Sequence, residues 1–237
     1  MGFLFTLLNR NKIKRYDHII SLGYNCEAAY QLFKHNGFLE SNLFAWAFIP
    51  SLQTLISVLS DLNRIGSEDY DGPDKSVMYS CNKTKILFHG KTDPKNFKDS
   101  PELFREDKEE LRSRVSFLKD KFVSVAQGND KKLYVLKVKS TETDIGEKIN
   151  DIRRLLEKQN NGSFDLLTVL EESFAKELSL TEENNFYIRT VSAYAPDDAV
   201  TSKKYPCFKE WQKIFDEFVP LHKLKKTKKY KFEEVEQ

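Results

Sequence analysis

The chain has 237 residues, of which 40% are hydrophobic and 31% are charged, a globular composition that excludes a disordered chain. Its 38 basic and 36 acidic residues leave a net charge of +2, so the whole-chain charge gives no case for nucleic-acid binding. The three cysteines are widely spaced and form no CxxC pair, which excludes a disulfide framework and indicates a reducing, cytoplasmic setting.

The two ends differ in composition from the middle. An apolar segment from Phe3 to Leu8 precedes a basic stretch, and it is far shorter than the roughly 20 residues that span a bilayer. The charge follows the apolar segment, which is not the order of a secretory signal. Residues 223–231 contain six lysines. We expect an N-terminal segment docked on the domain at 1–15, one domain at 16–220 and a solvated charged tail at 221–237. The alternative for both ends is peripheral membrane contact.

Residues 16–34 predict a strand, a tight turn and a helix in quick succession. Residues 18–22 form an apolar run, Gly23 interrupts it, and helix formers begin at Glu27. Asn25 suits an N-cap, which places Cys26 at the first helical position. There the helix dipole and unpaired N–H groups favour a thiolate over a thiol. Cys26 is therefore either a nucleophile or a small buried filler.

The next part of the chain predicts two helices and a hairpin. An aromatic cluster at 44–48 leads to Pro50, where a helix begins that reaches about residue 64. Residues 77–81 and 85–89 predict two short strands joined by a turn at 82–84. A further helix is expected from 100 to 122, broken near Glu106.

Apolar strands then alternate with helices to the end of the domain. Strands are expected at 133–138, 164–170 and 185–191, and helices at 144–159 and 206–218. This order predicts a single α/β domain with a mostly parallel central sheet and helices on both faces. Ligands of such sheets bind outside the carboxyl ends of the strands. Residues 23–26 and 89–93 both follow strands, so both are expected at that edge.

Cys26 and His89 form the leading candidate pair for catalysis. A cysteine nucleophile needs a base or a cation nearby, and a third group orients the imidazole. Asp93 is the nearest downstream carboxylate to His89, and Asp17 is another candidate. The structural alternative is that Cys26 fills space under a helix and that His89 is a hydrogen-bonded core histidine.

The candidates for binding a substrate are fewer and less specific. The turn at 23–26 has one glycine and no nucleotide fingerprint, although a single anion could bind there. Arginines are candidates for a phosphate or carboxylate, and Arg189 stands out because it lies within an apolar strand. No residues have the spacing of metal ligands, so we expect no metal and no cofactor. The expected substrate-binding residues are Gly23, Asn25, Trp46, Arg114 and Arg189.

Three short motifs carry a resemblance to a known family. The sequence from Ser21 to Cys26, the pair Phe44-x-Trp46 and the step Phe88-His89 resemble the bacterial family described as papain-like cysteine peptidases of unknown function. The resemblance covers most of the chain and implies that Cys26 is the nucleophile and His89 its base. Similar proteins are encoded beside surface-polysaccharide genes, which implies a glycan-related role.

One position departs from the family motif. The family has an aspartate where this chain has Ala45, and loss of an orienting carboxylate can cost several orders of magnitude in rate. The resemblance therefore leaves open a divergent or inactive member.

Three hypotheses of function follow. The first is a cytoplasmic cysteine-nucleophile enzyme of peptidase, amidase or acyl-transferase type, whose substrate is a small molecule, a peptide or a glycan. The second is a transferase or accessory protein of surface-polysaccharide biosynthesis without a cysteine nucleophile. The third is a non-catalytic module that binds a membrane surface through Phe3 to Leu8 and the lysine tail.

Overall fold

The structure is a computed structural model that describes residues 16–37, 39–66, 69–72, 78–91, 101–176, 178, 180–197, 199–200, 202–205 and 207–219. The apolar segment from Phe3 to Leu8, the lysine tail and Asp93 lie outside the described residues. None of the described helices combines the length and the apolar composition needed to cross a membrane.

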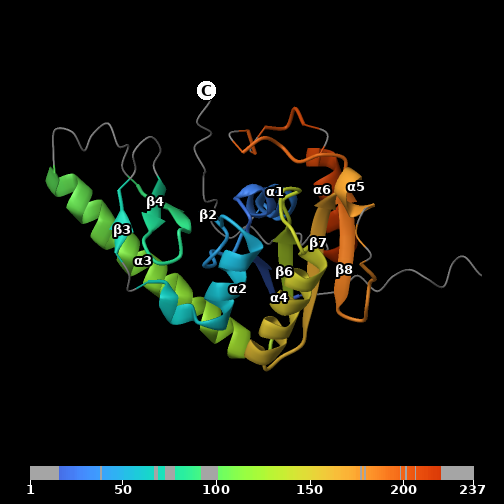
Figure 1. Cartoon of the computed structure of the whole chain (residues 1–237), viewed down its shortest axis with the longest axis horizontal. Helices are drawn as coiled ribbons and strands as arrows, with labels where there is room; N and C mark the ends of the chain where they lie inside the picture. Colours follow the sequence, from blue (N-terminus) through green and yellow to red (C-terminus); the bar gives the residue numbers. More distant parts are fainter. Residues whose placement is uncertain are drawn as a thin grey trace, which may run out of the picture.

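A four-stranded parallel sheet forms the centre of the molecule (Figure 1). Its strands stand in the order β1 (His18–Ser21), β6 (Lys132–Lys137), β7 (Phe164–Glu171) and β8 (Phe186–Val191). All three pairs of neighbouring strands are parallel. Every residue of β6 is buried, as expected for a parallel strand covered on both faces. The predicted fold class is confirmed.

Helices cover both faces of this sheet. The helices α1 (Glu27–Asn36) and α6 (Cys207–Phe218) pack on one face, while α2 (Leu52–Ser60), α3 (Pro101–Gln127) and α4 (Ile145–Gln159) pack on the other. Strand β6 shows the division, because successive side chains point to opposite faces. Leu133 and Val135 pack with α1 and α6, whereas Tyr134 and Leu136 pack with α2, α3 and α4.

A second, antiparallel sheet extends the molecule along the first part of α3 (Figure 1). Its strands stand in the order β2 (Ala47–Phe48), β5 (Leu87–His89), β4 (Met78–Cys81) and β3 (Tyr70–Asp71). The predicted hairpin is confirmed as β4 and β5, with the turn at residues 82–84. The remaining short elements are the 3-10 helix η1 (Leu62–Arg64) and α5 (Glu172–Ala175).

The predicted break near Glu106 is wrong, because α3 runs without interruption through this position. The adjacent Asp107 is buried and fixes the helix to the second sheet. Its carboxylate accepts hydrogen bonds from the Tyr79 hydroxyl at 2.8 Å and from the Lys91 backbone N–H at 3.0 Å. The ring of Phe104 stacks on that of Tyr79, with centroids 5.9 Å apart. These tertiary contacts hold the helix through the polar stretch where the sequence suggested an end.

Helix α2 begins at Leu52 rather than at Pro50, because Ser51 is its N-cap. The Ser51 Oγ accepts a hydrogen bond from the Thr54 N–H at 3.1 Å. Ser51→Ala is therefore expected to lower the free energy of unfolding by about 1 kcal/mol. Urea denaturation measures this, with Ser51→Thr as the control that keeps the cap. Equal stability of the alanine and threonine variants would contradict the capping role.

Candidate functional site

The carboxyl ends of the neighbouring strands β1 and β6 lie at a topological switch point of the parallel sheet. The chain leaves β1 toward α1 on one face and leaves β6 toward α4 on the other. In open α/β sheets ligands bind at such a switch point. The structure therefore places residues 22–26 at the edge that the sequence predicted for a site.

The backbone at this edge depends on Gly23. Its φ is +92°, and a Cβ there would lie 2.5 Å from the Cδ1 of Ile49. The Gly23–Tyr24 peptide bond is cis. The Gly23 carbonyl accepts a hydrogen bond from the Lys137 N–H at 3.1 Å, which continues the pairing of β1 with β6 into the turn. Gly23 thus has a structural role that brings the turn close to the end of β6.

Cys26 occupies the N-cap of α1, and Glu27 is the first helical residue. The prediction of Asn25 as the N-cap and Cys26 as the first helical residue is thus wrong by one position, because Asn25 lies one residue before the N-cap. The Asn25 Oδ1 accepts a hydrogen bond from the Glu27 N–H at 3.1 Å, so it still satisfies one of the orphan donors of the first turn.

The environment of the Cys26 thiol is a balance of opposing effects. Burial raises its pKa, and the negative charges of Glu27 and Asp197 raise it further. A backbone hydrogen bond and the ammonium of Lys137 lower it, but by less than burial raises it. Contrary to the expectation from the helix dipole alone, the resting group is a thiol, because desolvation penalises the charged form.

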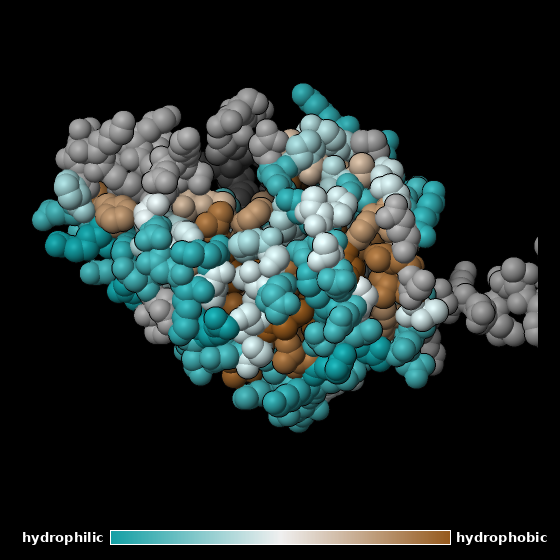
Figure 2. All heavy atoms as spheres, in the orientation of Figure 1, coloured by the Kyte–Doolittle hydropathy of each residue, from teal (hydrophilic) through white to brown (hydrophobic). Residues whose placement is uncertain are grey.

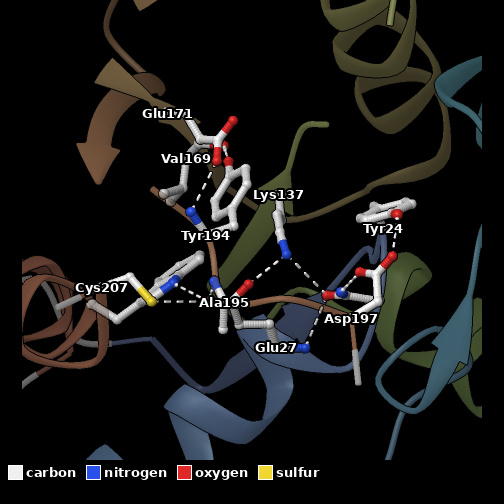
Figure 3. Close-up of polar contacts among 11 residues, drawn as sticks. Tyr24, Glu27, Lys137, Val169, Glu171, Tyr194, Ala195, Asp197 and Cys207 are labelled. Atoms are coloured by element: carbon white, nitrogen blue, oxygen red, sulfur yellow. Dashed lines mark hydrogen bonds and ion pairs between the residues drawn. The ribbon is translucent and has the colours of Figure 1, made fainter. Parts of the chain in front are cut away.

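A buried ion pair lies directly beside Cys26. Glu27 is 0% exposed and Lys137 is 1% exposed, and the Lys137 Nζ donates to the Glu27 Oε2 (Figure 3). The Glu27 Oε1 accepts a hydrogen bond from the Trp211 Nε1 at 3.2 Å. The Lys137 ammonium also lies over the Tyr194 ring, 4.1 Å from its centroid. Both buried charges are therefore compensated by several partners.

The side chain of Asn25 connects this ion pair to Asp197. The Lys137 Nζ donates to the Asn25 Oδ1 at 3.3 Å, and the Asn25 Nδ2 donates to the Asp197 Oδ1 at 2.8 Å (Figure 3). The Tyr24 hydroxyl donates to the Asp197 Oδ2 at 2.9 Å. Asn25, predicted as a substrate-binding residue, thus has its amide oxygen and nitrogen engaged within the protein.

Three members of this group were missed from the sequence, namely Glu27, Lys137 and Asp197. A signal existed for Lys137, because it is the one charged residue in the apolar run 133–138 that predicted this strand. Asp197 gave no signal, since it lies in a polar loop after β8 and meets the site only in the folded chain.

His89 lies on the second sheet, at the end of β5. Leu87 stands opposite Phe48 in this sheet, and His89 shares their face because side chains alternate along a strand. The Phe48 ring in turn contacts the Tyr24 ring, with centroids 5.0 Å apart. Phe48 therefore links the second sheet to the turn before Cys26, but His89 itself ends a strand of the antiparallel sheet, so the expected position of residue 89 at the carboxyl edge of the parallel sheet is wrong.

No hydrogen bond joins the Cys26 thiol to the His89 ring among the residues described. Burial lowers the pKa of His89, and the positive charge of Arg114 lowers it further, so the ring is neutral at pH 7. The Arg114 guanidinium donates to the His89 carbonyl oxygen, which gives this predicted substrate-binding residue a role in supporting β5. The catalytic pair of Cys26 and His89 stays a prediction.

Arg189 is bound within the protein rather than presented to a substrate. Its Nε donates to Glu217 at 2.8 Å, and its Nη1 atom pairs with Glu182. These carboxylates raise its pKa. Glu182 also accepts a hydrogen bond from the Ile188 N–H at 2.8 Å. The group therefore protects the outer edge of β8, which explains a charged residue in this strand.

The remaining predicted positions lie around β2, at the amino end of β1 or outside the described residues. Trp46 is half-buried immediately before β2. Ala45 is 0% exposed, so this position offers no group to a substrate. Asp93, the predicted third catalytic residue, lies outside the described residues. Asp17, the other candidate, accepts a hydrogen bond from the Lys131 N–H at 2.8 Å, just before β6 and far from the carboxyl edge of the sheet.

Two other features bear on ligands. In the part of the chain that the structure describes, no three His, Cys, Asp or Glu side chains are grouped to hold a metal ion. A hollow of about 390 Å³ lies between the C-terminal ends of α2, α3 and α4, lined in part by Leu59, Val123 and Leu155. Figure 2 shows hydrophobic residues at the surface between α2 and α4. This hollow lies at the amino edge of the parallel sheet and is remote from Cys26.

Comparisons with known protein families, with curated proteins and with solved structures found no match to this chain. The functional interpretation therefore rests on the chemistry and geometry of the residues themselves.

Proposed function

We propose that the chain is a cysteine-dependent hydrolase or acyl transferase, of peptidase, amidase or acyl-transferase type, with Cys26 as its nucleophile. One observation carries the proposal. The thiol lies at the start of α1 on the carboxyl edge of the parallel sheet, and the Lys137 ammonium is bonded to the residues before and after it. The resemblance of the segment from Ser21 to Cys26 to papain-like cysteine peptidases supports the same assignment.

The chemistry proceeds from a protonated thiol. Because burial raises the pKa of Cys26, its proton must be removed as the sulfur attacks the substrate carbonyl. His89 is the proposed base, and its lowered pKa supports this role because it leaves the imidazole neutral and able to accept the proton. Unpaired N–H groups in the first turn of α1 would stabilise the oxyanion.

The proposal is tested with Cys26→Ala and a generic acyl ester, p-nitrophenyl acetate. We expect the protein-catalysed hydrolysis to fall by about 10²-fold or more, because the nucleophile is lost. Cys81→Ala is the matched control, since Cys81 is buried in the second sheet, and it should keep the rate. Equal rates for Cys26→Ala and the unmodified chain would exclude Cys26 as nucleophile.

The second candidate is a transferase or accessory protein of surface-polysaccharide biosynthesis without a cysteine nucleophile. The raised pKa of Cys26 favours it, because the resting thiol is a poor nucleophile. Cell-surface polysaccharide made at the normal level by a strain carrying Cys26→Ala would support this candidate. In both cases the cysteine usage supports a cytoplasmic location.

A further inference from the structure

We propose that Lys137 is the positioning cation that stabilises the Cys26 thiolate once it forms. The carboxylate of Asp197, which is bonded to the same Asn25 side chain as Lys137, destabilises that thiolate. This inference rests on the proposed role of Cys26 as nucleophile. Lys137 and Asp197, which are not part of the predicted pair of Cys26 and His89, then control when the sulfur is reactive.

The position of Lys137 is fixed on every side. Its backbone N–H is bonded to the Gly23 carbonyl, and its Nζ is bonded to Asn25 and Glu27, the residues directly before and after Cys26. The Tyr194 ring lies against the ammonium from another direction. A cation held in this way is already in place when negative charge develops on the sulfur, so no reorganisation is needed.

Asp197 stands at the other end of the Asn25 amide. Both of its carboxylate oxygens are engaged, by the Asn25 Nδ2 and by the Tyr24 hydroxyl, yet the residue itself is exposed. The charged groups that act on the Cys26 thiol are Lys137 from β6, Glu27 from α1 and Asp197 from the loop after β8. Glu27 and Lys137 are buried together, so Asp197 is the charge of the three that solvent and a substrate can reach.

The two residues should therefore change Cys26 in opposite directions. Neutralising Asp197 leaves Lys137 less opposed and makes the thiolate easier to form, whereas removing Lys137 makes it harder to form. A purely structural role predicts a different pattern. Loosening the site would expose the sulfur in both variants and would speed its labelling in both.

The experiment measures the rate at which iodoacetamide alkylates Cys26 in the full chain as pH is raised, with Cys26 resolved from the other cysteines by peptide mapping. The pH range extends well above the ordinary thiol pKa of about 8.5, because burial raises the pKa of Cys26. Asp197→Asn should lower the midpoint by a few tenths of a pH unit, which is about twofold faster labelling at a fixed lower pH, because the charge of an exposed carboxylate is screened by solvent. Lys137→Met should raise the midpoint by a larger amount, because Lys137 is buried, and Lys137→Arg should restore it. Lys132→Met is the matched control and should leave the midpoint unchanged, because Lys132 is a buried lysine at the opposite end of β6 whose Nζ donates to the Gly128 carbonyl.

If Lys137→Met fails to fold, Asp197→Asn still tests the inference, because Asp197 is exposed and the substitution is isosteric. An unchanged or raised midpoint in Asp197→Asn would overturn the inference, as would a lowered midpoint in Lys137→Met. The outcome is separable from the proposed function. If Cys26→Ala loses ester hydrolysis but the pH midpoints of Cys26 labelling do not move, this inference alone fails. If the midpoints move while Cys26→Ala still hydrolyses the ester, the proposed function fails.

Discussion

Glu27→Ala is expected to lower the free energy of unfolding by about 3–5 kcal/mol, because it leaves the Lys137 ammonium buried without its carboxylate. The same change removes the acceptor of the Trp211 Nε1, which lies 3.2 Å from the Glu27 Oε1. An unpaired buried donor adds its own desolvation penalty. Urea denaturation followed by circular dichroism measures the loss.

A double-mutant cycle shows whether the ion pair is the cause. Glu27→Ala, Lys137→Met and the double variant are compared, because residues in one network show coupling that distant residues do not. We expect the double variant to be more stable than the sum of the two single losses predicts, since removing both charges leaves neither one buried alone. Strictly additive losses would mean that the pair contributes through packing and not through charge.

The parts of the fold that the sequence predicts well are those where one local pattern decides the structure. Strands β6 and β7 are apolar runs whose burial on both faces matches a parallel sheet, and α4 has apolar residues at helical spacing. The turn at 82–84 likewise determines the hairpin of β4 and β5. The break expected in α3 failed because Asp107 binds partners that only the folded chain brings to it.

The candidate site was less predictable because its members are far apart in the chain. Glu27 and Lys137 are 110 positions apart, and Asn25 and Asp197 are 172 positions apart. Their approach depends on the parallel pairing of β1 with β6 and on the path of the loop after β8. In the sequence Glu27 and Asp197 are two charged residues among many, so each is interpreted as part of a solvated surface.

The thiol shows why local reasoning about reactivity was incomplete. The helix start and its dipole are local features, and on their own they predict a thiolate. Burial of Cys26 is a tertiary property, and its effect on the pKa is larger and opposite in sign. The structure thus replaces the expected thiolate with a buried thiol, whose neighbours Asn25 and Glu27 are bonded to Lys137.

Trp211→Ala is expected to lower the free energy of unfolding by about 3–5 kcal/mol, the usual cost of removing a fully buried aromatic side chain. The indole is 0% exposed and stacks on Phe215, with ring centroids 5.4 Å apart. Trp211→Phe separates packing from hydrogen bonding, because it keeps an aromatic ring but removes the donor to Glu27. We expect this variant to lose about 0.5–1.5 kcal/mol, the net value of one hydrogen bond, because the Glu27 Oε1 keeps the Ala195 N–H and the Cys207 thiol as donors.

Trp211→Phe also tests whether the packing of α6 against Glu27 affects Cys26. The rate of Cys26 labelling is measured in Trp211→Phe at a temperature where the variant is folded. Phe218→Leu is the control on the same helix, because Phe218 is buried but packs on Tyr187 and not on Glu27. Losing the indole donor should weaken the hold on Glu27 and shift the pH midpoint of labelling, whereas the control should change stability alone. Equal stability and an equal midpoint in Trp211→Phe and the unmodified chain would show that the Trp211–Glu27 hydrogen bond supports neither the fold nor the site.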